Sequence, residues 1–290
     1  MSVELSSSSS NSVLSKLRSS VWEIQKAGTM MIVFGILSFI ILSFIILPVI
    51  YMVLRSEPGA LVETFFDFEV QNALILTLYT ATTVVLISLV FGVPLAYILA
   101  RVDFQGKGTV ESLIDIPILL PHTVSGLALL SIFGTSGLIG GILEPFNIVF
   151  RDTILGILIA QLFVSCPFLI KPARDAFEQV NPNLERAART LGATKTTVFF
   201  KITFPMAARG ILTGCVLTWA RAISEFGAVI ILAYYPYIAP VLIFRRFEGW
   251  GLSNSQPIAV ILVLVTVAIF LILRFLEKKP LKTYRPGGEK

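Results

Sequence analysis

The sequence has few charged residues and almost none of the side chains that build metal or redox sites. Asp, Glu, Lys and Arg make up 14% of its 290 residues, against roughly 25% in average soluble proteins. His122 is the single histidine, which excludes a zinc site of the H-E-x-x-H kind. The two cysteines, Cys166 and Cys215, both lie in apolar segments. They imply neither a disulfide framework nor a thiolate metal site, so we expect no metal ligands.

The sequence also lacks the motifs of an ATPase and the residue sets of an enzyme. Gly106-Lys107 is followed by Gly108, without the upstream glycine or the Ser/Thr of a phosphate-binding loop. No nucleophile–base–acid set is visible, so we expect no catalytic residue and no cofactor bound by this chain. If ATP is used, ATP and Mg²⁺ would be bound by a partner.

Apolar residues make up 55% of the chain and gather in long runs. About 20 consecutive apolar residues are enough for a helix to cross a bilayer. The runs predict an all-α, polytopic membrane helical bundle of six transmembrane helices, at residues 30–54, 72–100, 113–133, 154–170, 210–233 and 257–275. Prolines and polar residues interrupt the third span, and Pro94 is expected to kink the second.

The positions of Lys and Arg predict the orientation in the cell membrane. With the N-terminus in the cytoplasm, basic residues concentrate in the tails and loops assigned to the cytoplasmic side, as the positive-inside rule requires. Those on the other side are Arg55, Arg151, Arg245 and Arg246, and Arg221 lies within a span. The distribution of the basic residues therefore predicts a multi-pass topology with both termini cytoplasmic, and despite the net charge of +5 nucleic acid is not an expected partner.

We expect three parts along the chain. Residues 1–29 would hold a Ser-rich disordered tail and an amphipathic cytoplasmic helix on the membrane surface. Residues 30–276 would form the transmembrane domain, and residues 277–290 a cytoplasmic basic tail. The segments assigned outside are too short to fold as a ligand-capturing domain. An importer of this kind would therefore depend on a separate binding protein.

A polar helix-turn-helix at residues 181–205 interrupts the apolar pattern. Asn181-Pro182 is typical of a helix start, and Gly192 of a helix end. Thr194 is expected to cap a second helix, which Pro205 would break. An apolar stripe runs along the first helix at i, i+3, i+4 and i+7, formed by Leu184, Ala187, Ala188 and Leu191. Its small alanines would let another surface approach closely.

The spacing of this segment resembles the EAA loop of ATP-binding-cassette importer permeases. Glu185-x-Ala187-Ala188-x-x-x-Gly192 is followed after nine residues by Ile202-x-Phe204-Pro205. Arg186 and Phe204 depart mildly from the family pattern. The resemblance implies a coupling helix that fits a cleft on a cytoplasmic ATPase, through Glu185, Ala187, Ala188, Arg189, Gly192, Ala193 and Pro205. The alternative is an ordinary amphipathic helix between two spans.

Arg221 and Glu225 place two charges within the fifth span. At a spacing of i, i+4 they can pair, which lowers the cost of placing both charges in a bilayer. One interpretation is a neutralised pair that fixes helix packing. The other is that Arg221 contributes positive potential to an anion path, moderated by Glu225. Ser224 and Gly227 belong to the same small-residue stretch and suit close helix contact either way.

The third span offers a second candidate for a translocation path. A helix broken near Pro117 and Pro121 could expose amides or hydroxyls to a passing oxyanion. A proline kink, with Thr123 and Ser125 bonded back to the backbone, is an equal alternative. Gly126 completes this set of candidates.

Both stretches resemble the permeases of sulfate, molybdate and tungstate importers. The motifs are L-P-x-x-V-S-G-L-A-L-L at residues 120–130 and A-R-A-I-S-E-F-G-A-V at residues 220–229. The continuation at residues 231–247 is most similar to the tungstate/molybdate permeases. The resemblance implies a type I importer core with two copies of this subunit, two ATPase copies and an external oxyanion-binding protein, working by alternating access in the lipid bilayer. Alternatives are a sulfate permease of the same family, an ion-coupled secondary transporter and a membrane scaffold.

Overall fold

The computed structural model describes residues 6–278, except for the side chains of residues 6–27, 273, 274 and 276–278. The chain divides into two compact units, Met1–Ser56 and Glu57–Lys290. Throughout the described residues the regular structure is helical, which confirms the predicted all-α class.

The first unit is one helix, α1, which runs from Ser6 to Leu54. Its Gly28–Leu54 part is long and apolar enough to cross a membrane. The backbone is helical from Ser6, without a break between the expected surface helix and the expected first span. Residues 1–5, at the start of the expected tail, lie outside the described residues.

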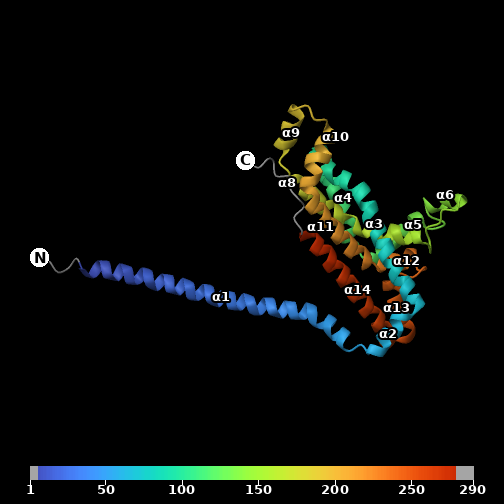
Figure 1. Cartoon of the computed structure of the whole chain (residues 1–290), viewed down its shortest axis with the longest axis horizontal. Helices are drawn as coiled ribbons and strands as arrows, with labels where there is room; N and C mark the ends of the chain where they lie inside the picture. Colours follow the sequence, from blue (N-terminus) through green and yellow to red (C-terminus); the bar gives the residue numbers. More distant parts are fainter. Residues whose placement is uncertain (1–5, 279–290) are drawn as a thin grey trace, which may run out of the picture. The chain divides into compact units, whose positions relative to one another are not determined.

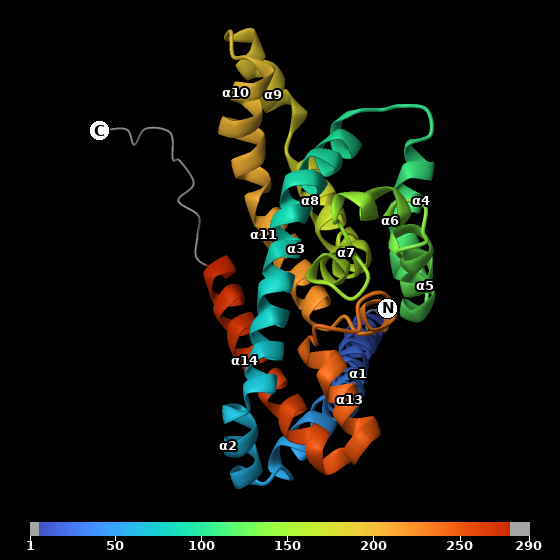
Figure 2. The same cartoon turned by 90° about the vertical axis from the view of Figure 1, so that its right-hand side faces the viewer.

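The second unit is a bundle of long and broken helices (Figure 1, Figure 2). Their bounds are α2 Pro58–Phe66, α3 Phe68–Arg101, α4 Lys107–Leu119, α5 His122–Phe133, α6 Gly140–Leu143, the 3-10 helix η1 Glu144–Phe146, α7 Ile154–Ser165, α8 Pro167–Gln179, α9 Pro182–Thr190, α10 Lys195–Val198, the π-helix η2 Phe199–Thr203, α11 Phe204–Ile223, α12 Gly227–Leu232, α13 Ala239–Trp250 and α14 Leu252–Lys278. In both views α9 and α10 lie at the opposite end of this unit from α2 and α13.

Within the described residues, four helices are long and apolar enough to cross a membrane, and six spans result if two bent pairs each count as one. The α4–α5 pair bends by 111°, and the α7–α8 pair by 43°. The break predicted at Pro121 is confirmed, because Pro121 occupies the N-cap of α5. Pro117 instead lies inside α4.

The prediction that Pro205 breaks its helix is wrong. Lys195–Ile223 is one continuous candidate span of 29 residues, so the fifth span begins well before residue 210. The reason is the π-helix over Phe199–Thr203, after which the Phe204 amide donates to the Phe199 carbonyl. Pro205 then falls in the first turn of α11, where its missing N–H is tolerated. The same span ends early, at Ile223, and α12 follows after a break at residues 224–226.

Close contacts between α8 and α11 hold the centre of the bundle. A Cβ added to Gly214 would lie 3.0 Å from the carbonyl oxygen of Leu169, and one added to Gly210 would lie 2.3 Å from Cβ of Ala176. Leu169 and Phe177 are fully buried beside α3. This contact fixes the end of α8, from which the 181–205 segment departs.

A second core holds the broken helices together. Leu129 of α5, Ile157 of α7 and Leu232 of α12 are buried in one cluster. The breaks before α5 and α12 therefore lie in a tightly packed part of the protein, where their ends are held in place.

Candidate functional site

The two predicted helix starts and the predicted helix end at residues 181–198 are confirmed. Asn181 caps α9, with its Oδ1 accepting from the Asn183 amide at 2.9 Å. Gly192 has φ +90°, a left-handed conformation that favours glycine. Its amide donates to the Arg189 carbonyl, and the next amide, of Ala193, donates to the Ala188 carbonyl. This is a Schellman ending. Thr194 caps α10 through the Thr197 amide at 3.2 Å.

α9 presents most of its side chains to solvent, and none is buried. Leu184 is 44% exposed and Leu191 89% exposed. Of the predicted coupling residues, Ala187, Arg189, Gly192 and Pro205 are exposed and Ala188 and Ala193 are half-buried. Exposed leucines beside small residues and arginines form a surface of the kind that a protein groove receives.

Glu185 differs from the other predicted coupling residues because its carboxylate points into the protein. Its Oε1 accepts from Nε of Arg101 at 2.9 Å and from the hydroxyl of Thr203 at 3.0 Å. The Arg101 side chain is 12% exposed and that of Glu185 15% exposed. Glu185 therefore anchors α9 to the end of α3.

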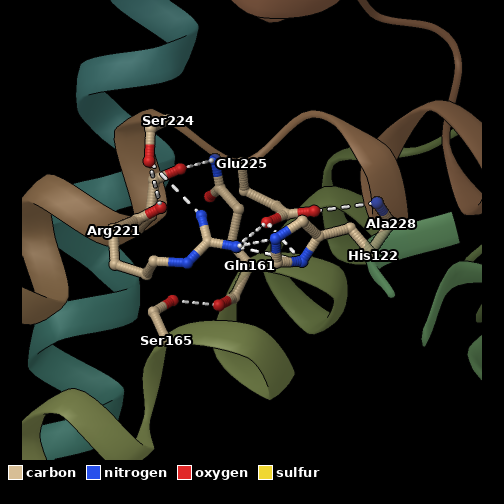
Figure 3. A network of polar contacts seen from close by, with 8 residues as sticks. His122, Gln161, Ser165, Arg221, Ser224, Glu225 and Ala228 are labelled. Carbon is tan, nitrogen blue, oxygen red and sulfur yellow. Dashed lines mark hydrogen bonds and ion pairs between the residues drawn. The ribbon is translucent and has the colours of Figure 1, made fainter. Parts of the chain in front are cut away.

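At the other candidate site, Arg221, Glu225 and His122 form one polar network (Figure 3). Nη2 of Arg221 lies 2.6 Å from Oε2 of Glu225 and 3.1 Å from both ring nitrogens of His122. The other carboxylate oxygen of Glu225 accepts from the Ala228 amide at 2.8 Å, at the start of α12. The glutamate therefore closes the break between α11 and α12, while His122 joins this break to the start of α5.

Further polar groups lie beside the network. Nη1 of Arg221 lies 3.3 Å from the hydroxyl of Ser224, which donates to the Arg221 carbonyl at 3.0 Å. Gln161 of α7 donates to the Ala222 carbonyl at 3.1 Å, and the Ser165 hydroxyl donates to the Gln161 carbonyl (Figure 3). Both terminal nitrogens of the Arg221 guanidinium thus have hydrogen-bond partners within the protein. The pairing that the i, i+4 spacing predicted is therefore present, and whether Arg221 also acts on an anion path stays a prediction.

Two predicted glycines lie where α5 meets α12. A Cβ on Gly126 would lie 2.7 Å from Cβ of Ile231, and one on Gly227 would lie 2.6 Å from Cβ of His122. Ser125 is fully buried, and its hydroxyl has no hydrogen-bond partner among the described residues. Pro121 and Thr123 are exposed and lie outside the Arg221 network. The predicted third-span residues thus divide between a packed contact and an exposed helix start.

The sequence did not predict site roles for three residues, His122, Gln161 and Arg101. His122 follows Pro121 at the predicted break, and this position at a helix start is the signal that could have identified it. Gln161 is a fully buried amide in an otherwise apolar stretch, which is itself a sign of a structural role. Among the described residues, no group of three or more His, Cys, Asp or Glu side chains could hold a metal ion.

Comparison with known proteins relates the chain to membrane transport subunits. The family described as "Binding-protein-dependent transport system inner membrane component" matches residues 92–281. The molybdate/tungstate transport system permease protein WtpB of Thermococcus kodakarensis is 48% identical, over 79% of this chain and 87% of the relative. WtpB of Methanocaldococcus jannaschii is 41% identical, over 87% of this chain and 97% of the relative. The sulfate transport system permease protein CysT of Synechocystis is 32% identical, over 70% of this chain and 72% of the relative.

A solved structure shares the fold. It is a bacterial ABC transporter involved in the import of the acidic polysaccharide alginate, with a TM-score of 0.70 and 18% identity. The match covers 90% of this chain and 99% of that one. At this identity the likeness shows the fold alone, which is that of type I ABC importer permeases.

Proposed function

Because this chain belongs to the family of binding-protein-dependent transport system inner membrane components, we propose that it is the permease subunit of an ATP-driven importer for molybdate or tungstate. The observation that carries the substrate class is the 48% identity to a molybdate/tungstate permease over most of both chains. The sulfate permeases share less, at 32%. A sulfate permease is therefore the second candidate.

The motor in this proposal is a separate pair of P-loop ATPase subunits. The exposed face of α9, with Leu184 and Leu191, would fit a cleft on each of them. Such a pair demands two permease copies, so we propose a homodimer. ATP and Mg²⁺ would be held by the ATPase, since the sequence has no phosphate-binding loop of its own.

We propose that α9 and both termini are cytoplasmic. The basic residues support this, because they concentrate on the side where α9 lies. α2 and α13 would then lie outside, at the opposite end of the second unit (Figure 2). A separate oxyanion-binding protein would deliver the substrate there. Another alginate transporter structure, with a TM-score of 0.70, is described as a complex with a substrate-bound periplasmic protein, which supports such an arrangement.

Alternating access would move the broken helices. When ATP closes the ATPase pair, the two α9 helices would be drawn together and the attached spans would swing from inward-open to outward-open. The breaks before α5 and α12 are packed against each other at His122 and Gly227, so α5 and α12 would move together as one body. The Arg221–Glu225 pair would preserve the packing beside the path during the swing.

Proteoliposomes test this function directly. They would contain the chain, a P-loop ATPase and an oxyanion-binding protein from the same genome, with ATP enclosed. We expect uptake of labelled molybdate or tungstate that requires ATP hydrolysis and the binding protein, and that a large excess of sulfate does not displace. Uptake by this chain alone, driven by an ion gradient, would instead establish a secondary transporter. Uptake of sulfate in preference to both other anions would establish the second candidate.

A further inference from the structure

One guanidinium group joins three separate segments at the end of the bundle that carries α9. Arg101 is the last residue of α3. Its Nε and Nη2 both lie 2.9 Å from Oε1 of Glu185 on α9, and Nη2 donates to the carbonyl of Val180 at 2.8 Å. Val180 is the C-cap of α8. The same Glu185 oxygen accepts from Thr203 of the π-helix. The ends of α3 and α8, α9 and the π-helix therefore meet around one ion pair.

Burial of side chains contributes little to holding α9 in place. It is a nine-residue helix in which no side chain is buried. A helix this short is marginally stable by itself, and its orientation depends on tertiary contacts. The Arg101–Glu185 pair is shielded from water on both sides, at 12% and 15% exposed. Charge-assisted hydrogen bonds are roughly twice as strong as neutral ones, and shielding reduces screening by salt.

The α3 end of this contact is rigid. Tyr97, one turn before Arg101, packs edge-on against Phe177 of α8 at 5.3 Å and against Phe199 at 4.9 Å. α3 continues for 34 residues to the far end of the second unit, where it meets α13. A displacement of α9 that acts on Arg101 would therefore act on the whole of α3.

We infer that Arg101 is a positioning residue for coupling, which ties α9 to α3 so that movement of α9 moves the span. This assigns Glu185 an inward role, as the anchor of the coupling helix, and leaves docking to the exposed residues of α9. The inference rests on the proposed function, because coupling presupposes an ATPase bound at α9.

The test compares three variants in the proteoliposomes described above. Arg101→Gln removes the positive charge and the guanidinium group that donates to both Glu185 and Val180. Arg101→Glu combined with Glu185→Arg exchanges the two charges and restores a pair. Lys107→Gln is the matched control, because it breaks an i, i+4 pair between a half-buried lysine and the fully exposed Asp103 in the neighbouring loop. For each variant, the readout is anion imported per ATP hydrolysed, measured on complexes purified in equal amount by size exclusion.

We expect Arg101→Gln to lower the anion imported per ATP about tenfold, within the range typical of coupling between sites. ATP hydrolysis should continue, since the ATPase is intact. The exchanged pair should recover most of the loss, and Lys107→Gln should resemble the wild type. A residue that served only stability would lower complex yield and leave the ratio unchanged. An unchanged ratio in Arg101→Gln would overturn the inference.

A distance measurement gives a second, independent test on the full chain without partners. Spin labels at Thr190→Cys on α9 and Ile98→Cys on α3, both exposed positions, report how firmly the helices are tied. Cys166 and Cys215 would be replaced by alanine in the background. We expect a narrow distance distribution that broadens in Arg101→Gln, and an equally narrow one in both would overturn the inference. If the wild type transports nothing, the proposed function fails while this measurement still decides the role of Arg101.

Discussion

Glu225 is 1% exposed, and its carboxylate lies 2.6 Å from the guanidinium of Arg221 one helical turn away. A buried carboxylate is costly without its counter-charge. Removing Arg221 alone should therefore harm the protein more than neutralising both partners.

This relationship yields the first prediction. Arg221→Gln should destabilise the protein by about 3–5 kcal/mol, as expected when one partner of a buried pair is removed. The double variant with Glu225→Gln should regain much of that loss. Thermal unfolding in detergent, followed by tryptophan fluorescence, measures both. A stable double variant that no longer transports anions would show that Arg221 also acts on the anion path.

The second prediction concerns the contact between α5 and α12. Gly126→Ala should destabilise the protein by about 1–3 kcal/mol, because the new methyl group overpacks a tight contact. Its Cβ would lie 2.7 Å from Cβ of Ile231 and 3.0 Å from the Ala228 carbonyl oxygen. Gly108→Ala in α4 is the control, since its Cβ meets nothing within 4 Å. That change should be neutral or stabilising by up to about 1 kcal/mol. Equal unfolding temperatures for the two variants would contradict the close contact.

The third prediction separates backbone strain from docking. Gly192 and Gly106 both have φ +90° and open space around a Cβ. Aspartate at either position introduces the same charge and a similar strain, of about 1 kcal/mol or more. If α9 docks on the ATPase as proposed, Gly192→Asp at its end should lower the anion imported per ATP hydrolysed by about tenfold or more. Gly106→Asp should leave the coupling intact, and a similar loss in both would exclude a specific role for the Gly192 corner.

The fourth prediction concerns the far end of the second unit. Asp67 caps α3 by accepting from the Glu69 amide at 2.8 Å, and it pairs with Arg246 of α13 at 2.5 Å. Burial acts to raise the pKa of Asp67, but the Arg246 guanidinium and the amides of Glu69 and Val70 together hold that pKa below its ordinary value. A carboxyl with a lowered pKa stabilises the folded protein above its unfolded pKa. That contribution is lost as the pH falls through the folded pKa.

Acidification should therefore weaken the α3–α13 contact. Between about pH 5 and pH 3, the unfolding temperature of the wild type should fall more steeply than that of Asp67→Asn. Asparagine is a good helix cap, so this variant keeps the cap and removes the titrating charge. Parallel curves for the two proteins would mean that Asp67 contributes no pH-dependent stability.

Local signals were enough to predict the helix starts and the helix end within residues 181–198. Asn181, Gly192 and Thr194 act through backbone geometry and near-neighbour hydrogen bonds, which a sequence states directly. Pro205 misled the prediction because the π-helix before it changes the hydrogen-bond register. The local sequence gives no signal that predicts a π-helix.

Contacts between segments far apart in the sequence could not be predicted. Arg101 and Glu185 are 84 residues apart, and His122 and Arg221 are 99 apart. The i, i+4 spacing of Arg221 and Glu225 predicted their pairing, but not the histidine that joins them from another helix. α13 was also not predicted. Its Arg245 and Arg246 pair with Asp67 and Glu69, which lie far away in the sequence, so no local pattern marks these contacts.

The most direct test of the proposed function is the side of the membrane on which α9 lies. Thr190→Cys at the exposed end of α9 and Ser253→Cys near the start of α14 would each be made in a background without Cys166 and Cys215. Intact cells would be treated with a membrane-impermeant maleimide. We predict that position 253 is labelled at once and position 190 only after the membrane is permeabilised. Labelling of position 190 in intact cells would place the coupling helix outside, away from any ATPase, and would contradict the account.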